Sequence, residues 1–98
     1  MYYYVYLIQS LPYPDQRYVG ITQGLNNRLD VHNSGGSVHT AKYKPWELVM
    51  YFAFKNESKA RHFEKYLKSG SGRAFAQKRF WISDLSFKND EAMLNRSM

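Results

Sequence analysis

The 98 residues of this chain are enough for one domain with a hydrophobic core, since 44% of them are hydrophobic and 17% are aromatic. The absence of cysteine excludes a disulfide framework and a thiolate zinc site, and it fits the reducing cytoplasm, where we expect the protein. We find neither a charged leader before an apolar run nor a stretch of about 18 apolar residues, so we expect neither secretion nor a membrane partner.

The net charge of +6, from 14 Lys and Arg against 8 Asp and Glu, is typical of a protein that binds a polyanion. Charge alone leaves simple solubility as an equally good explanation. The distribution favours binding, because ten of these cations lie between residues 42 and 79, a range whose only acids are Glu47, Glu57 and Glu64. We therefore expect a basic face with nucleic acid as its partner.

The first third of the chain predicts a β-hairpin. Aromatic and β-branched residues favour strands over residues 2–9 and 17–21, and the Leu-Pro-Tyr-Pro-Asp sequence between them favours a turn. In an antiparallel hairpin of this length, Tyr6 and Tyr18 lie opposite or nearly opposite each other. Cross-strand packing is the simplest interpretation of such tyrosines.

A helix is predicted after the hairpin, over residues 23–33. Thr22 suits its N-cap, and Ser-Gly-Gly at 34–36 ends it. Arg28 and His32 are one turn apart beside the apolar stripe of this helix, so we expect them to face the sheet or its edge. A surface arginine and a histidine that stabilises the helix C-terminus are the simpler interpretation.

The second half of the chain predicts a third strand and a second helix. Residues 46–54 are apolar on both faces, which predicts a central position in the sheet. Asn56 suits the N-cap of a helix over residues 57–69. The inward stripe of this helix consists of Ala60, Phe63 and Leu67.

Gly-Ser-Gly at 70–72 ends that helix, and a short third helix is predicted over residues 71–79. Residues 1–82 are therefore expected to form one domain of α+β class, a three-stranded antiparallel sheet flanked by helices. Residues 83–98 are mostly polar, and we expect an extension there that is a short helix or partly disordered. Its apolar residues are Leu85, Phe87, Met93 and Leu94.

Glu64 is the sharpest single indication of chemistry. It lies within the apolar stripe of the second helix, and carboxylates are seldom buried unless they are paired or bound to a metal ion. An ion pair with Arg28, or a side chain that extends to solvent, would also explain its position. Beside it, Arg61, Lys65 and Lys68 form a basic stripe, which is either a solvated face or a track for phosphates.

Together these side chains predict hydrolysis of a phosphodiester. The planar guanidinium of Arg28 suits phosphate oxygens, and His32 can orient a water or pass a proton. A phenol such as that of Tyr6 or Tyr18 becomes a useful base where cations and a metal-bound water lower its pKa from about 10. Glu64 supplies one metal ligand, so the set meets the requirements of the reaction.

The ordered motifs resemble those of the GIY-YIG nuclease superfamily, most closely its small stand-alone bacterial members. Tyr4-Val5-Tyr6 takes the place of Gly-Ile-Tyr, and Tyr18-Val19-Gly20 takes the place of Tyr-Ile-Gly. The likeness spans about residues 2–82 and includes Asn27-Arg28-Leu29, His32 to Gly35, Pro45 to Val49, Glu64 and Lys68-Ser69-Gly70. The chain departs from the family at Tyr4, at Ile21 and Thr22, where some members have a lysine, and at Gln77, a loose match for a family asparagine.

This resemblance implies the three-stranded fold and one divalent metal ion, Mg²⁺ or Mn²⁺, held by Glu64. It further implies Tyr18 or Tyr6 as general base for an attacking water, Arg28 as the group that stabilises the transition state, and His32 as a site residue. Lys42, Lys44, Arg61, Lys65 and Lys68 are expected to contact the nucleic acid.

We therefore expect a metal-dependent endonuclease that acts in DNA repair or recombination on structured, damaged or single-stranded DNA, with RNA left open as a substrate. Selectivity is expected to come from DNA shape or from a protein partner, since no separate base-reading module is visible. A nucleic-acid-binding module without catalysis is the alternative. A purely structural interaction protein is a third hypothesis, which the basic face disfavours.

Overall fold

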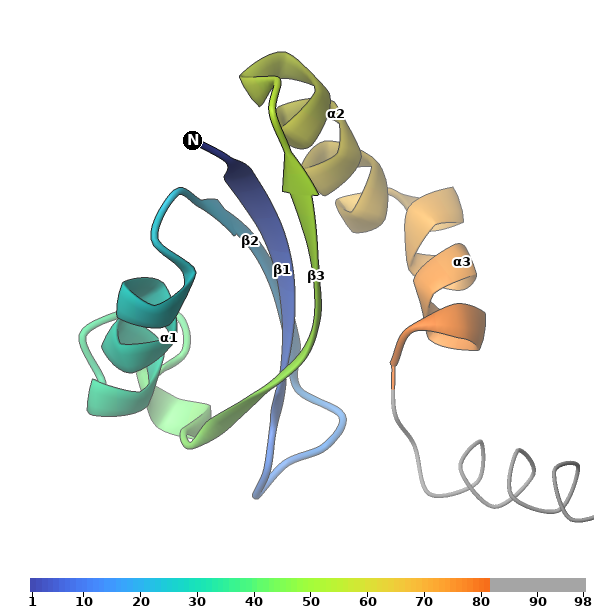
Figure 1. The fold of residues 1–98 in the computed structure, drawn as a ribbon. Helices are drawn as coiled ribbons and strands as arrows, with labels where there is room; N and C mark the ends of the chain where they lie inside the picture. Colours follow the sequence, from blue (N-terminus) through green and yellow to red (C-terminus); the bar gives the residue numbers. More distant parts are fainter. Residues whose placement is uncertain (82–98) are drawn as a thin grey trace, which may run out of the picture.

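The structure, a computed structural model, describes residues 1–81, and these form a three-stranded antiparallel sheet with α-helices on both of its faces (Figure 1). This arrangement confirms the predicted α+β class. The extension predicted around Leu85, Phe87, Met93 and Leu94 lies outside the described residues. None of the helices within residues 1–81 is long and apolar enough to cross a membrane.

The sheet consists of β1 (Tyr3–Ser10), β2 (Arg17–Thr22) and β3 (Trp46–Phe54), in the order β2-β1-β3. The central strand is therefore β1, and the prediction that residues 46–54 are central is wrong. Apolar residues on the second face of β3 do not all become buried, because this part of the sheet has no helix over it. Tyr51, for example, is 51% exposed.

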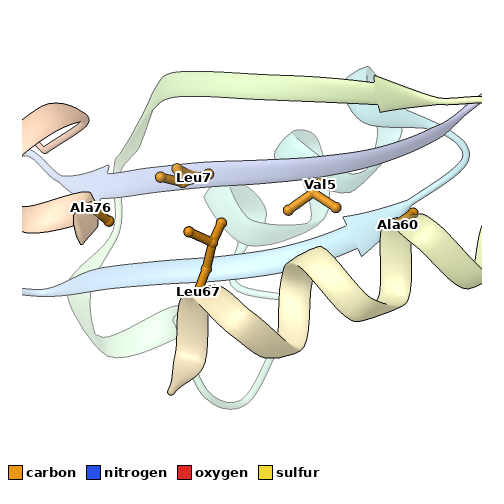
Figure 2. Close-up of a cluster of buried hydrophobic side chains, with 5 residues drawn as sticks. All are labelled: Val5, Leu7, Ala60, Leu67 and Ala76. Carbon is orange, nitrogen blue, oxygen red and sulfur yellow. The ribbon is translucent and has the colours of Figure 1, made fainter. Parts of the chain in front are cut away.

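The central strand β1 contributes side chains to two apolar layers, one on each face of the sheet, because successive side chains of a strand point to opposite faces. Val5 and Leu7 pack against α2 (Glu57–Lys68) and α3 (Gly70–Arg79), where they meet Ala60, Leu67 and Ala76 (Figure 2). This cluster confirms the inward stripe predicted for α2.

The opposite face of β1 carries Tyr6 and Ile8, which pack with Trp46 and with the helix α1 (Leu25–Ser34). Leu25 and Leu29 of α1 lie against this second cluster. As a result, α1 covers one face of the sheet and the pair of α2 and α3 covers the other (Figure 1). The central strand thus places functional side chains on the α1 face and core side chains on the α2 face.

Two of the predicted helix ends, at Asn56 and Gly35, are confirmed, and the N-cap predicted at Thr22 is wrong. Asn56 caps α2 by accepting a hydrogen bond from the Lys59 amide at 3.0 Å, as predicted. Gly35 ends α1 in the left-handed region at φ 85°, also as predicted. Thr22, however, does not cap α1, which begins at Leu25 after Gly24. Thr22 still belongs to β2, and its hydroxyl accepts the Gly24 amide at 3.1 Å within the connecting turn.

Candidate active site

The side chains predicted to do chemistry converge at β2, an edge strand of the sheet. The Tyr6 and Tyr18 rings are 6.3 Å apart between centroids, although Tyr6 pairs directly with Gly20 and Tyr18 with Ile8. The prediction that the two tyrosines lie nearly opposite each other is therefore confirmed. The His32 ring of α1 lies 5.7 Å from Tyr6 and 5.1 Å from Tyr18, measured between centroids.

Helix α2 reaches the same place from the other side of the strand. The Lys68 ammonium lies 5.8 Å from the centroid of the Tyr18 ring, and it forms an ion pair with Glu64 at 2.6 Å. Arg28 and Glu64 lie near enough to Tyr6 for their charges to bear on its pKa. The structure therefore gathers Tyr6, Tyr18, Arg28, His32 and Glu64 in one region, from strands β1 and β2 and helices α1 and α2, and this region is the candidate site.

Gly20 allows Tyr6 to reach this site. A Cβ atom at residue 20 would lie 2.4 Å from the Tyr6 hydroxyl and 2.5 Å from the carbon that carries it, distances far below van der Waals contact. The Tyr6 phenol therefore lies across the backbone of β2 at the one residue without a side chain. Glycine inside a strand often marks such a close approach, and this is the signal that identifies Gly20 as a site residue.

His32 is buried, with 1% of its surface exposed, and both of its ring nitrogens have protein partners. Its Nε2 lies 2.8 Å from the Tyr6 hydroxyl, and its Nδ1 lies 2.7 Å from the hydroxyl of Thr40. The neutral ring donates to one of these hydroxyls and accepts from the other. His32 thus acts on the site through Tyr6. A role at the helix C-terminus, the simpler interpretation of His32, does not account for these buried contacts. Arg28, in contrast, is exposed, so the expectation that it faces the sheet is wrong and the simpler interpretation of a surface arginine holds.

Thr40 holds the far side of the His32 ring, and sequence reasoning missed it. It is buried, and it lies in the irregular segment between α1 and β3, where no periodic pattern indicates which side chains point inward. The carbonyl of Thr40 also accepts a 2.9 Å hydrogen bond from the Trp46 indole, which anchors this segment to the start of β3. Thr40, His32 and Tyr6 therefore form a fixed chain of hydrogen bonds that ends at the site.

Burial sets the protonation states of the Tyr6 and His32 pair. It raises the pKa of Tyr6 well above its usual value, with the negative charges of ionised Tyr18 and Glu64 adding to the rise and Arg28 opposing it. Burial also lowers the pKa of His32, and Arg28 lowers it further. At neutral pH the protein alone therefore holds a neutral phenol against a neutral imidazole.

Stability is expected to fall as the pH drops below about 6.5, the pKa of an unperturbed histidine. The folded protein holds His32 at a lower pKa, so between the two values the unfolded chain binds more protons and the free energy of unfolding rises with pH. Urea unfolding of wild type and of His32→Gln across this range measures the effect. His62→Gln, at an exposed histidine on α2, is the matched control. An unchanged pH dependence in His32→Gln would contradict the assignment.

Glu64 is half-buried, and its partner is Lys68 on the same helix. The Glu64 side chain is 20% exposed, so the apolar stripe covers it only in part, and Lys68 lies one turn further along α2. An ion pair was one of the alternative explanations for the position of Glu64, and the structure shows one, with Lys68 and not with Arg28. The Glu64 carboxylate remains partly exposed on the side of α2 that carries Lys68.

The donor set fits a divalent ion such as Mg²⁺, which proteins often hold through one or two carboxylates plus water and substrate phosphates. Residues 1–81 contain no group of three or more His, Cys, Asp or Glu side chains that could enclose a metal ion by themselves. Glu64 alone would therefore hold the ion from the protein side. The ion would have to displace the Lys68 ammonium, which now occupies the carboxylate.

The basic residues predicted to bind nucleic acid separate into two groups. Arg61, Lys65 and Lys68 are exposed on α2 beside the site, and Arg61 forms a 2.7 Å ion pair with Glu57. Arg61 and Arg28 together line a hollow of about 450 Å³ between the end of β2 and the start of α2. Lys42 and Lys44 are also exposed, but they lie between α1 and β3 and do not line this hollow.

The fold and this arrangement define a small α+β domain that gathers tyrosine, histidine, lysine and glutamate side chains at an edge strand. A model of the GIY-YIG catalytic domain matches residues 2–79, so the chain belongs to the GIY-YIG nuclease superfamily and the predicted resemblance is confirmed.

Two known proteins show how far the similarity extends. The chain is 35% identical over 74 residues to the structure-specific endonuclease subunit SLX1 of Debaryomyces hansenii, an alignment that covers 68% of this chain and 21% of SLX1. The chain thus spans about a fifth of the length of that relative. A solution NMR structure of a UPF0213 protein from Bacillus halodurans is 31% identical, with a TM-score of 0.49, and the match covers 79% of this chain and 81% of that one.

Proposed function

We propose that this protein is a divalent-metal-dependent endonuclease that hydrolyses phosphodiester bonds in DNA. One observation carries the proposal: the Tyr6, Tyr18 and His32 rings are grouped at one edge of the sheet, and Lys68 joins Tyr18 to the Glu64 carboxylate there. Phenols, a cation and a carboxylate at one edge are the groups that this hydrolysis requires.

Each residue has a role that its surroundings support. Glu64 holds Mg²⁺ or Mn²⁺, which supplies Lewis-acid polarisation of the phosphate and a more acidic water. Arg28 projects into the hollow beside the site, where its guanidinium can bind the equatorial oxygens of the phosphate as their charge develops. Lys68, once released from Glu64, provides a second cation next to Tyr18.

Tyr6 and Tyr18 are the two candidates for the general base. Tyr6 has a partner for the proton it would take up, because its hydroxyl lies 2.8 Å from His32 Nε2. Accepting a proton from water while passing its own to His32 would keep Tyr6 neutral, in line with its raised pKa, but it would charge His32, which the lowered pKa of that ring opposes. Tyr18 is less buried than Tyr6, and the Lys68 ammonium lies 5.8 Å from the centroid of its ring.

The proposed substrate is structured or branched DNA, in a repair or recombination reaction. The support is the similarity to SLX1, whose name describes a structure-specific endonuclease, together with the net charge of +6. Because the matched region is about a fifth of SLX1, this preference is proposed for the catalytic domain only. A protein partner would have to bind a surface outside the site described above.

Arg28→Ala is expected to lower the cleavage rate by about 10²- to 10³-fold, since it removes one donor to the developing charge. The measurement is cleavage of branched, nicked, single-stranded and duplex DNA, and of RNA, with Mg²⁺ or Mn²⁺. Lys55→Ala is the control, because Lys55 is an exposed cation that lies over the Tyr2 ring, away from the site.

Two results would overturn the proposal. Equal cleavage rates for Arg28→Ala and the wild type would show that Arg28 takes no part in catalysis. Salt-sensitive binding without cleavage of any substrate would instead show a binding module, the alternative function of this fold.

A further inference from the structure

A second hollow, of about 480 Å³, opens on the other side of Glu64. The first hollow lies against the end of β2 and the start of α2, at Ile21 and Arg61. The second lies against the start of β2 and the end of α2, at Tyr18 and Lys68, and is closed by α3. Because Glu64 lies between Arg61 and Lys68 on α2, the two hollows flank the site along the seam between β2 and α2.

The second hollow is basic. Arg17, Lys68 and Arg73 line it, against the single carboxylate of Asp15. These three cations come from three different elements, β2, α2 and α3, so their convergence is a product of the fold and not of one charged helix face. Cations that contact only solvent need not converge around a concave space. A bound phosphate group would account for their convergence.

Arg17 is held in place within this hollow. Its guanidinium donates to the Gln77 side chain from Nη1 and lies over the Trp81 ring, 5.4 Å from the centroid. Its Nε is buried and has no hydrogen-bond partner within the described part of the chain. A guanidinium held in this way at the wall of a hollow is suited to an oxyanion, because its planar fork offers several N–H donors.

The occupant of this hollow would touch the site directly. Tyr18 and Lys68 line the hollow, and the same Lys68 ammonium is 2.6 Å from Glu64. A group bound here is therefore the immediate neighbour of the phosphate being cleaved. The Trp81 indole forms part of the wall and is half-buried, so the part of the ring that Arg17 and the core leave open is available for contact with a nucleic-acid base.

We propose that this hollow is a subsite for an unpaired nucleotide adjoining the scissile phosphate, with Arg17, Lys68 and Arg73 binding its phosphate and Trp81 contacting its base. The inference rests on the proposed nuclease function and adds a substrate class to it. A base within a duplex is covered on both faces and cannot reach Trp81. The favoured substrate therefore has a single-stranded segment on this side of the cut.

Arg73→Gln tests the phosphate contact, with Lys78→Gln as the matched control. Both residues are exposed cations of α3, but only Arg73 lines the hollow. Binding of a short oligothymidylate is measured over a range of salt in a Glu64→Gln background, so that cleavage does not interfere. Arg73→Gln is expected to reduce the slope of log Kobs against log salt by about 0.7, the effect of one lost phosphate contact, and Lys78→Gln to leave it unchanged.

Tryptophan emission tests the base contact independently. Trp46 is buried on the opposite face of the sheet, so the change on adding the oligonucleotide should come from Trp81 and disappear in Trp81→Phe. Equal salt slopes for Arg73→Gln and Lys78→Gln, or an emission change that survives in Trp81→Phe, would overturn the subsite. If the wild type cleaves DNA while these tests fail, the nuclease function stands without the subsite. If the protein binds the oligonucleotide as described but cleaves no DNA, the subsite is supported and the nuclease function is not.

Discussion

Glu64→Gln is expected to abolish cleavage, with a loss of about 10³-fold or more, while the protein stays folded and still binds DNA. The substitution keeps the size of the side chain but removes the charge that a divalent ion needs, and residues 1–81 contain no group of three or more His, Cys, Asp or Glu side chains that could hold the ion without it. Cleavage of branched DNA, unfolding in urea and salt-dependent binding are the three measurements.

Glu47→Gln is the control for this experiment. Glu47 is an exposed carboxylate of β3 that lines neither of the two hollows, so its loss removes a negative charge away from the tyrosines. Loss of the Glu64 carboxylate should also remove Mn²⁺ binding, which can be measured without any substrate. Full activity of Glu64→Gln, or an equal loss in Glu47→Gln, would show that the metal is held elsewhere.

Gly20→Ala is expected to cost about 1 to 3 kcal/mol of stability and to slow cleavage by about 10²-fold. The new methyl group would lie 2.4 Å from the Tyr6 hydroxyl, so the phenol must move and its hydrogen bond to His32 is lost. Urea unfolding reports the strain, and cleavage at a temperature where the variant is folded reports the displaced tyrosine.

Gly70→Ala separates this effect from the general consequences of replacing a glycine. A Cβ atom at residue 70 meets nothing within 4 Å, so the variant should match the wild type in stability and activity. If Gly20→Ala retained full activity, the position of Tyr6 across β2 would have no part in catalysis.

Local patterns were sufficient for the elements and for much of the site. The strands and helices follow from period-two and period-3.6 spacing of apolar residues, and all fall within two residues of their predicted ends. Arg28 and His32 lie one turn apart on α1 in any fold that keeps the helix. The placement of Glu64 at the margin of the α2 stripe follows from the same periodicity, and its 20% exposure agrees with it.

Strand order could not be predicted in this way. The apolar residues on both faces of residues 46–54 indicated a central strand, but burial in a sheet depends on which helix covers which face. Here β1 is central because both neighbours pair with it, and part of β3 remains uncovered at Tyr51. Thr22 was misassigned for a related reason, since pairing with Tyr4 extends β2 to that residue and delays the helix.

The sequence by itself determined which groups are available: two tyrosines, an arginine, a histidine and a glutamate, each on an element that periodicity identifies. Only the tertiary structure decided what each group touches, because those contacts join residues far apart in the chain. Thr40 meets His32 and Arg17 meets Gln77 through packing of separate elements, and Glu64 reaches Tyr6 only because α2 lies along β2. Local propensity carries no information on such pairings, whereas burial against the sheet determines them.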